Sequence, residues 1–171
     1  MPFSRRLTTP LSSTATFLAV TILVAAGDAI SKGMAESLWA NERYPLLGQL
    51  LRIELVHNSA GAFSTSLGAW TLEINLALTV VALLLAVAAS PMLARFDAIA
   101  PHALGLVAGA AAGNLTSMAT STRGVPDFLA IAHGQGALVL NVADVAAYLG
   151  LALCARIVWS VGRRAFALHS G

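Results

Sequence analysis

The 171-residue sequence is poor in charge, cysteine and lysine. Only 11% of its residues are charged, whereas an ordinary soluble domain carries roughly 25%. The single cysteine, Cys154, excludes an intrachain disulfide and a cysteine metal cluster. The four histidines lack the HxxxH spacing of a zinc site, and the net charge of +2 is too small to favour a nucleic-acid partner. We therefore expect no metal, no cofactor and no nucleic acid.

Hydrophobic residues, by contrast, make up 57% of the chain, and the mean hydropathy is +0.77. Four segments are long and apolar enough to cross a bilayer, which takes about 20 residues. We expect these spans at about residues 14–32, 73–94, 98–119 and 137–160. The composition thus predicts an all-α membrane protein, with residues 1–171 forming a single integral-membrane domain.

The arginines predict the orientation of the spans, because cytoplasmic connections carry an excess of basic residues. Arg5 and Arg6 precede the first span, Arg95 lies between the second and third, and three more arginines end the fourth. With four spans, these residues all fall on one side. Both termini are therefore predicted to be cytoplasmic, and the connections at about 31–72 and 120–136 to face outward.

Two local patterns add detail to this outline. Residues 52–57 alternate weakly and are rich in β-formers, which predicts a short strand. Asn58 and Gly61 follow it in "NSAGAFS" and suit a turn. In the third span, glycines four residues apart predict a smooth face for close helix packing. These glycines are Gly105, Gly109 and Gly113.

Two carboxylates near the outer side suggest chemistry. Asp144 lies in the apolar fourth span, where an ionised carboxylate costs at least ~2.5–3.5 kcal/mol, and at 1.5 Å per helical residue it would lie roughly 10 Å below the outer mouth. Asp127 lies in the connection that precedes this span. Two such carboxylates brought together share one proton. One can then deprotonate a water while the other hydrogen-bonds the scissile carbonyl, as in aspartic proteases.

Other polar residues are predicted at the same depth. Asp28 and Lys32, one helical turn apart, can pair and are expected to orient the fold rather than perform chemistry. The asparagines of this outer half are Asn58, Asn114 and Asn141. Simpler interpretations stay open: Asp144 could merely cap its helix or pair with Arg123, and Asp127 could belong to an ordinary Pro-Asp loop.

Five short motifs, in order along the chain, resemble those of signal peptidase II, the lipoprotein signal peptidase of bacteria. "GDAISK" resembles D-x-x-[ST]-K, and "HNSAGAFS" resembles N-x-G-A-A-F. "AAGN" resembles the start of G-N-x-x-D-R, "VPDF" resembles V-x-D-F, and "LNVAD" resembles F-N-x-A-D. Each motif is short, but five in the right order on a four-span chain make a specific signal.

The resemblance implies four transmembrane helices with a small extracytoplasmic β-cradle in the connection between the first two spans. It implies removal of signal peptides from diacylglyceryl-modified prolipoproteins at the lipobox cysteine, with Asp127 and Asp144 as the catalytic pair. The expected partners are lipidated prolipoproteins and membrane lipids, and the protein is expected to be a monomer in the bacterial inner membrane, with its site near the periplasmic side. The residues expected to bind substrate or support the aspartates are Asn58, Gly61, Asn114, Asn141 and Arg123.

The sequence departs from the family pattern at one motif, where Ser117 and Met118 replace the Asp-Arg pair. This departure bears on substrate positioning more than on the chemistry, since both aspartates are present. A second hypothesis is therefore a non-catalytic or substrate-altered membrane paralogue that binds lipidated peptides. A small transporter or proton relay is a weaker alternative, because no polar residue continues the path through the inner half of the fourth span before Arg156.

Overall fold

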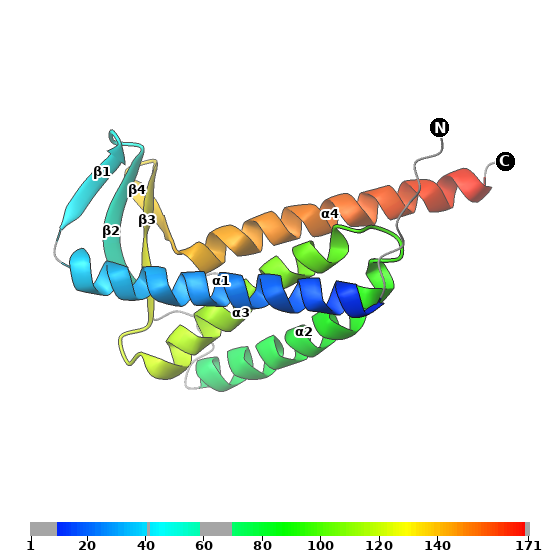
Figure 1. Ribbon diagram of the computed structural model, residues 1–171. Coiled ribbons are helices and arrows are strands. Elements are labelled where there is room, and N and C mark those ends of the chain that lie inside the picture. The colour runs from blue at the N-terminus through cyan, green and yellow to red at the C-terminus, as the bar shows by residue number, and fades with distance from the viewer. Residues whose placement is uncertain (1–9, 41, 59–69, 170–171) are drawn as a thin grey trace.

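The computed structural model describes residues 10–40, 42–58 and 70–169, and it combines a helical bundle with a small sheet (Figure 1). The elements in chain order are α1 (Pro10–Leu38), β1 (Arg43–Leu47), β2 (Leu51–Asn58), α2 (Thr71–Leu93), α3 (Ala100–Thr120), β3 (Val125–His133), β4 (Gly136–Leu140) and α4 (Val142–His169). The sheet lies at one end of the bundle, and α1 begins and α4 ends at the opposite end (Figure 1).

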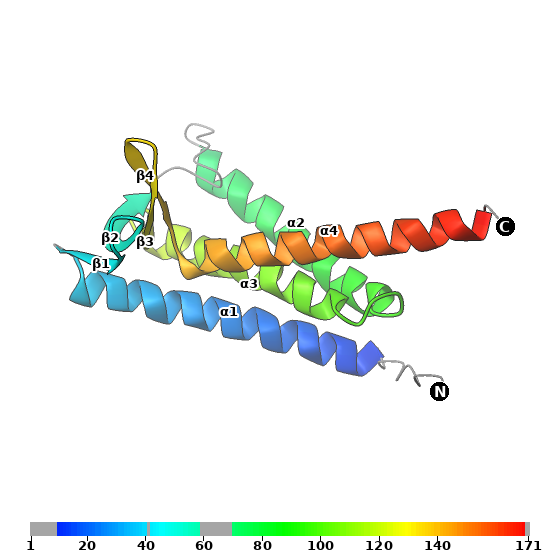
Figure 2. The same ribbon diagram turned by 90° about the horizontal axis from the view of Figure 1, so that it is seen from above.

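Three of the helices are long and apolar enough to cross a membrane. These segments are Leu11–Leu38 in α1, Leu76–Leu93 in α2 and Val142–Arg163 in α4. Helix α3 forms where the third span was expected, but it is rich in alanine and glycine and carries polar residues near its end. It packs against α1, α2 and α4, so it is the central helix of the bundle (Figure 2).

The mostly helical fold with a small sheet is confirmed, but the sheet is not confined to the connection between the first two spans. The sheet is antiparallel with the order β1-β2-β3-β4, so half of it comes from the connection between α3 and α4. The strand expected at residues 52–57 is confirmed as part of β2. Residues 137–140, expected to begin the fourth span, belong to β4, and α4 begins at Val142.

The hairpin between β3 and β4 explains this difference. His133 pairs with Gly136, and Gly134 at the turn has φ +56°, a conformation that glycine adopts without strain. The strand that follows, "GALVL", is a short apolar run, and periodicity cannot distinguish such a run from a buried helix segment. The turn therefore favours a hairpin over a helix at residues 137–140. As a result, α4 begins only at Val142, and Asp144 lies in its first turn.

The glycine face of α3 packs directly on α1, as expected. A Cβ atom added at Gly105 would lie 2.8 Å from Val20 Cβ, and one added at Gly109 would lie 2.6 Å from Val24 Cβ. Both distances are too short for real side chains, so only glycine permits this approach. The close packing fixes the C-terminal half of α3 relative to α1, where the polar residues gather.

Candidate active site

Asp144 lies in the first turn of α4, not a turn or two inside it. Asn141 precedes the helix, and its Oδ1 accepts a hydrogen bond from the Asp144 backbone N–H at 2.9 Å. In return, Asp144 Oδ2 accepts from the Asn141 backbone N–H at 3.0 Å. This reciprocal pair is a capping box, and a helix N-terminus favours a negative charge at this position. Asp144 therefore does cap its helix, but only one of its oxygens is used for the cap.

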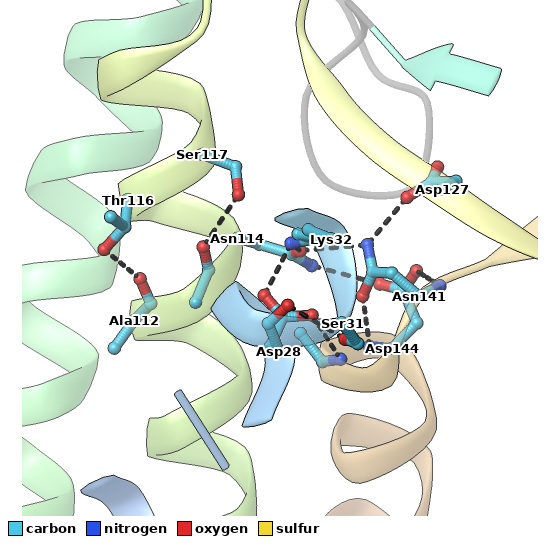
Figure 3. Close-up of polar contacts among 12 residues, drawn as sticks. Asp28, Ser31, Lys32, Ala112, Asn114, Thr116, Ser117, Asp127, Asn141 and Asp144 are labelled. Carbon is cyan, nitrogen blue, oxygen red and sulfur yellow. Dashed lines mark hydrogen bonds and ion pairs between the residues drawn. The ribbon is translucent and has the colours of Figure 1, made fainter. Parts of the chain in front are cut away.

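The other oxygen of Asp144 faces α3. Asn114 Nδ2 donates to Asp144 Oδ1 at 3.1 Å (Figure 3). Asn114 lies in the C-terminal half of α3, one residue after Gly113, so the close α1–α3 packing sets its position. Both oxygens of Asp144 thus accept hydrogen bonds within the site.

Asp127 lies in β3 and is only 6% exposed. Asn141 Nδ2 donates to its Oδ1 at 2.6 Å, and Asn58 Nδ2 lies 3.4 Å from its Oδ2. Burial and, to a smaller extent, the negative charge of Asp144 raise the pKa of Asp127, while the two amides and Lys32 oppose the shift, and the net pKa is about 6. Asp127 is therefore the carboxyl group that takes up a proton more readily than an ordinary aspartate.

Asp127 is placed by a strand and not by a loop. Asn58 pairs with Val125 and Val56 pairs with Asp127 across β2 and β3. Pro126 has no N–H to donate, and it lies before Leu129, where pairing with β4 begins. The Pro-Asp sequence thus fits an antiparallel strand at a point where β3 has a neighbour on one side.

Asn141 joins the two carboxylates (Figure 3). Its Nδ2 donates both to Asp127 Oδ1 and to Asn114 Oδ1, the latter at 3.1 Å, while its Oδ1 caps α4. The side chain is 1% exposed and has all its hydrogen-bonding groups satisfied. Within the described residues no hydrogen bond joins Asp127 directly to Asp144, and Asn141 lies between the two carboxyl groups, with its side chain on Asp127 and its backbone N–H on Asp144.

Asp28 and Lys32 form the predicted ion pair, at 2.6 Å, and both are buried. The second oxygen of Asp28 accepts from the backbone N–H of Ala143 at 2.9 Å, so this carboxylate from α1 also caps α4. Lys32 Nζ donates to Asn114 Oδ1 at 2.7 Å. The pair therefore holds both Asn114 and the first turn of α4, and through them Asp144.

Gly113 makes room for this ion pair. A Cβ atom at Gly113 would lie 2.6 Å from Asp28 Oδ2, so a larger residue would push the carboxylate away from the N-terminus of α4. The glycine stripe predicted for packing thus has a second effect at Gly113, where the missing side chain leaves space for the carboxylate of Asp28 beside the candidate site.

One of the residues expected to support the site, Arg123, does not contact the aspartates. Arg123 is exposed, and its Nη2 donates to Glu36 Oε1 at 2.8 Å. It therefore does not pair with Asp144. Gly61 lies outside the described residues.

Glu36 and His57 were missed by the sequence analysis. His57 Nε2 lies 3.1 Å from the same Glu36 oxygen that Arg123 contacts. Glu36 follows Asp28 and Lys32 at four-residue intervals on α1, and this spacing could have indicated it. Among the described residues, no three His, Cys, Asp or Glu side chains cluster as metal ligands do.

The fold and the site together define a class of protein. A buried carboxyl group of raised pKa lies near a second carboxylate at the N-terminus of a helix, in a bundle with three helices apolar enough to span a membrane. These are the components of an aspartic-type peptidase built into a membrane.

The comparisons with known proteins identify the family. The sequence model of the family described as signal peptidase (SPase) II matches residues 20–160. The chain therefore belongs to the signal peptidase II family, the lipoprotein signal peptidases of the bacterial inner membrane. No curated protein matches the sequence.

Solved structures share the fold. A bacterial membrane enzyme solved by the in meso method at 2.3 Å resolution aligns with a TM-score of 0.74 and 18% identity, over 85% of this chain and 88% of that one. A second bacterial membrane enzyme, solved by the same method at 1.9 Å, aligns with a TM-score of 0.73 and 19% identity, over 84% and 92% of the chains. At these identities the likeness establishes the fold alone.

Proposed function

We propose that this protein is an intramembrane aspartic endopeptidase that removes signal peptides from diacylglyceryl-modified prolipoproteins at the lipobox cysteine. The observation that carries the proposal is that Asn141 hydrogen-bonds both carboxyl groups, that of Asp127 through its side-chain amide and that of Asp144 through its backbone N–H. Family membership supports the same conclusion. Asn58, Asn114 and Asn141 are then the residues that orient the two carboxyl groups.

The two carboxyl groups divide the reaction between them. Asp144, oriented by the hydrogen bonds of its cap and of Asn114, takes a proton from a water as that water attacks the scissile carbonyl carbon. Asp127, protonated, donates a hydrogen bond to the carbonyl oxygen as negative charge develops on it. When the tetrahedral intermediate collapses, the C–N bond breaks and the proton passes to the leaving amine. The second product is the new carboxyl terminus of the signal peptide.

The proposed membrane arrangement follows from the same geometry. All four helices span the bilayer as a monomer, with the sheet on the periplasmic side and both termini in the cytoplasm. The start of α1 and the end of α4 lie together at the end opposite the sheet, which supports this orientation (Figure 1). The candidate site, at the sheet end, would then meet substrates near the periplasmic surface.

The proposal is tested by replacing each aspartate with asparagine. Asp127→Asn and Asp144→Asn should each abolish cleavage of a lipidated precursor by the purified protein. Asp97→Asn is the matched control, since asparagine can still accept the hydrogen bond from the Ile99 N–H before α3, and the ion pair that it removes is with the exposed Arg156. Normal processing by either site variant would end the assignment of the catalytic pair.

The alternative, a membrane protein that binds lipidated peptides without cutting them, is favoured by one observation. Ser117 and Met118 stand where the family pattern has Asp-Arg. Binding and cleavage of a fluorescent lipidated peptide by the unmodified protein separate the two functions. Tight binding with no cleavage would establish the binder, and turnover would exclude it.

A further inference from the structure

A cleft of about 450 Å³ opens between α1 and α3, beside the candidate catalytic residues. This volume is in the range of ligand sites, roughly 300–1,000 Å³. Small residues one turn apart on α1, namely Ala25, Ala29 and Gly33, form one wall. Pro126, the neighbour of Asp127, lies at its edge. A chain reaching Asp127 therefore has an adjoining space to occupy.

The opposite wall, on α3, is lined by hydroxyl groups that present acceptors. Thr116 Oγ1 donates to Ala112 O at 2.8 Å, Ser117 Oγ to Gly113 O at 3.2 Å, and Thr120 Oγ1 to Thr116 O at 2.7 Å. The first two bonds are drawn in Figure 3. A hydroxyl has one proton to donate and two lone pairs. Because each proton is used within the helix, what this wall offers to a ligand is oxygen lone pairs, which recognise N–H groups.

Hydrogen-bond donors lie at two other points of the cleft. Lys32 has three N–H groups, and its described partners, Asp28 and Asn114, use two of them. Arg123 lies at the mouth, where one guanidinium nitrogen binds Glu36 and the side chain is 67% exposed. The cleft therefore combines acceptors along one wall with donors at Lys32 and at Arg123.

An extended polypeptide matches this mixture, because its main chain carries N–H and C=O groups along its whole length. A lipid ester carries acceptors only and would leave the α3 hydroxyls without a donor. Resting on the proposed function, we propose that the cleft binds the main chain of the substrate just after the lipidated cysteine. Its second and third residues would lie between Gly33 and Thr120 and leave past Glu36 and Arg123.

Two glycines of α1 allow a matched test. A Cβ atom added at Gly33 or at Gly27 meets no atom within 4 Å, and only Gly33 lines the cleft. Gly33→Leu should fill the cleft and weaken binding of an uncut lipidated peptide to the Asp127→Asn protein by about tenfold or more, a change worth about 1.4 kcal/mol. Gly27→Leu should leave binding unchanged. Equal affinity of the two leucine variants overturns the proposal.

The chemistry is tested with N-methylated peptides. Methylation of the amide nitrogen at the second or third residue after the cysteine should weaken binding about fivefold, the effect of one net hydrogen bond. In a protein that also carries Thr116→Val, Ser117→Ala and Thr120→Val, the same methylation should cost nothing further, because the acceptors of this wall are already lost. An equal penalty in both backgrounds contradicts a main-chain contact.

The lipid alternative gives a different result. If Gly33→Leu weakens binding only of peptides with long acyl chains, and not of a short-chain thioether, the cleft holds lipid and the proposal is wrong. Because these measurements use the Asp127→Asn protein and record binding, they are independent of whether the unmodified protein cleaves. A failure of cleavage thus rejects the proposed function. If Gly33→Leu binds like Gly27→Leu, or if N-methylation has the same effect in both backgrounds, the proposed role of the cleft in peptide binding is rejected.

Discussion

Asn141→Ser should move the alkaline limb of the pH–activity profile to higher pH. Serine is as good an N-cap as asparagine, so the start of α4 is kept, but the amide that donates to Asp127 at 2.6 Å is lost. A hydrogen bond to a charged group contributes about 1.5–3 kcal/mol, and one pKa unit corresponds to about 1.36 kcal/mol. The loss should therefore raise the Asp127 pKa by about 1–2 units, from about 6 to about 7–8.

The sign follows from the role of Asp127 as the protonated partner. In the unmodified protein its proton is lost as the pH rises through about 6, and kcat/KM for a lipidated peptide should fall there. In Asn141→Ser the proton is retained to higher pH, so the fall in kcat/KM should occur about 1–2 pH units higher, although the maximal rate is lower. Asn141→Ala, which also loses the cap, should show the same shift of the alkaline limb, and its free energy of unfolding should be lower by about 1 kcal/mol. An alkaline limb that stays in place in Asn141→Ser refutes the reasoning.

Further changes test the supports of the site. Gly113→Ala should lower the unfolding temperature in detergent and the rate of cleavage, because its Cβ would lie 2.6 Å from Asp28 Oδ2, whereas Gly27→Ala meets no atom within 4 Å and should not destabilise. Asp28→Asn should lower the free energy of unfolding by about 3–5 kcal/mol, since it leaves Lys32 charged and buried without its partner. Adding Lys32→Met should recover part of that free energy, and no recovery would contradict an electrostatic cause. Arg123→Gln should cost less than about 1 kcal/mol, because its ion pair is exposed, and a larger loss would show that the pair is structural.

The parts of the structure that the sequence predicted are those with a local pattern or a fixed spacing. The Asp28–Lys32 ion pair follows from their separation by one helical turn, and the close approach of α1 and α3 follows from the glycine stripe. The strand at residues 52–57 follows from its β-forming residues. The gathering of three asparagines around the aspartates follows from the order of the spans, because it places three segments at one end of the bundle.

The parts that the sequence did not predict depend on contacts between distant segments. Strand β4 is too short for its periodicity to exclude a helix, so the expected depth of Asp144 was wrong by the length of that strand. The contacts of Glu36 with His57 and Arg123 join α1, β2 and the connection that follows α3. No spacing within one segment specifies such contacts, since they exist only once the sheet is seated on the bundle.

The capping role of Asn141 also determines where the catalytic proton can lie. Its Oδ1 is occupied by the Asp144 backbone N–H, so the amide cannot turn over to accept a hydrogen bond from Asp127 without uncapping α4. Oxygen Oδ1 of Asp127 therefore faces a close N–H donor, at 2.6 Å, and we expect a proton taken up by Asp127 to reside on Oδ2. Among the described residues, the partner of that oxygen is the more distant Asn58 amide, at 3.4 Å. The O–H of protonated Asp127 is thus left for the substrate carbonyl, and the same side chain that begins α4 keeps it there.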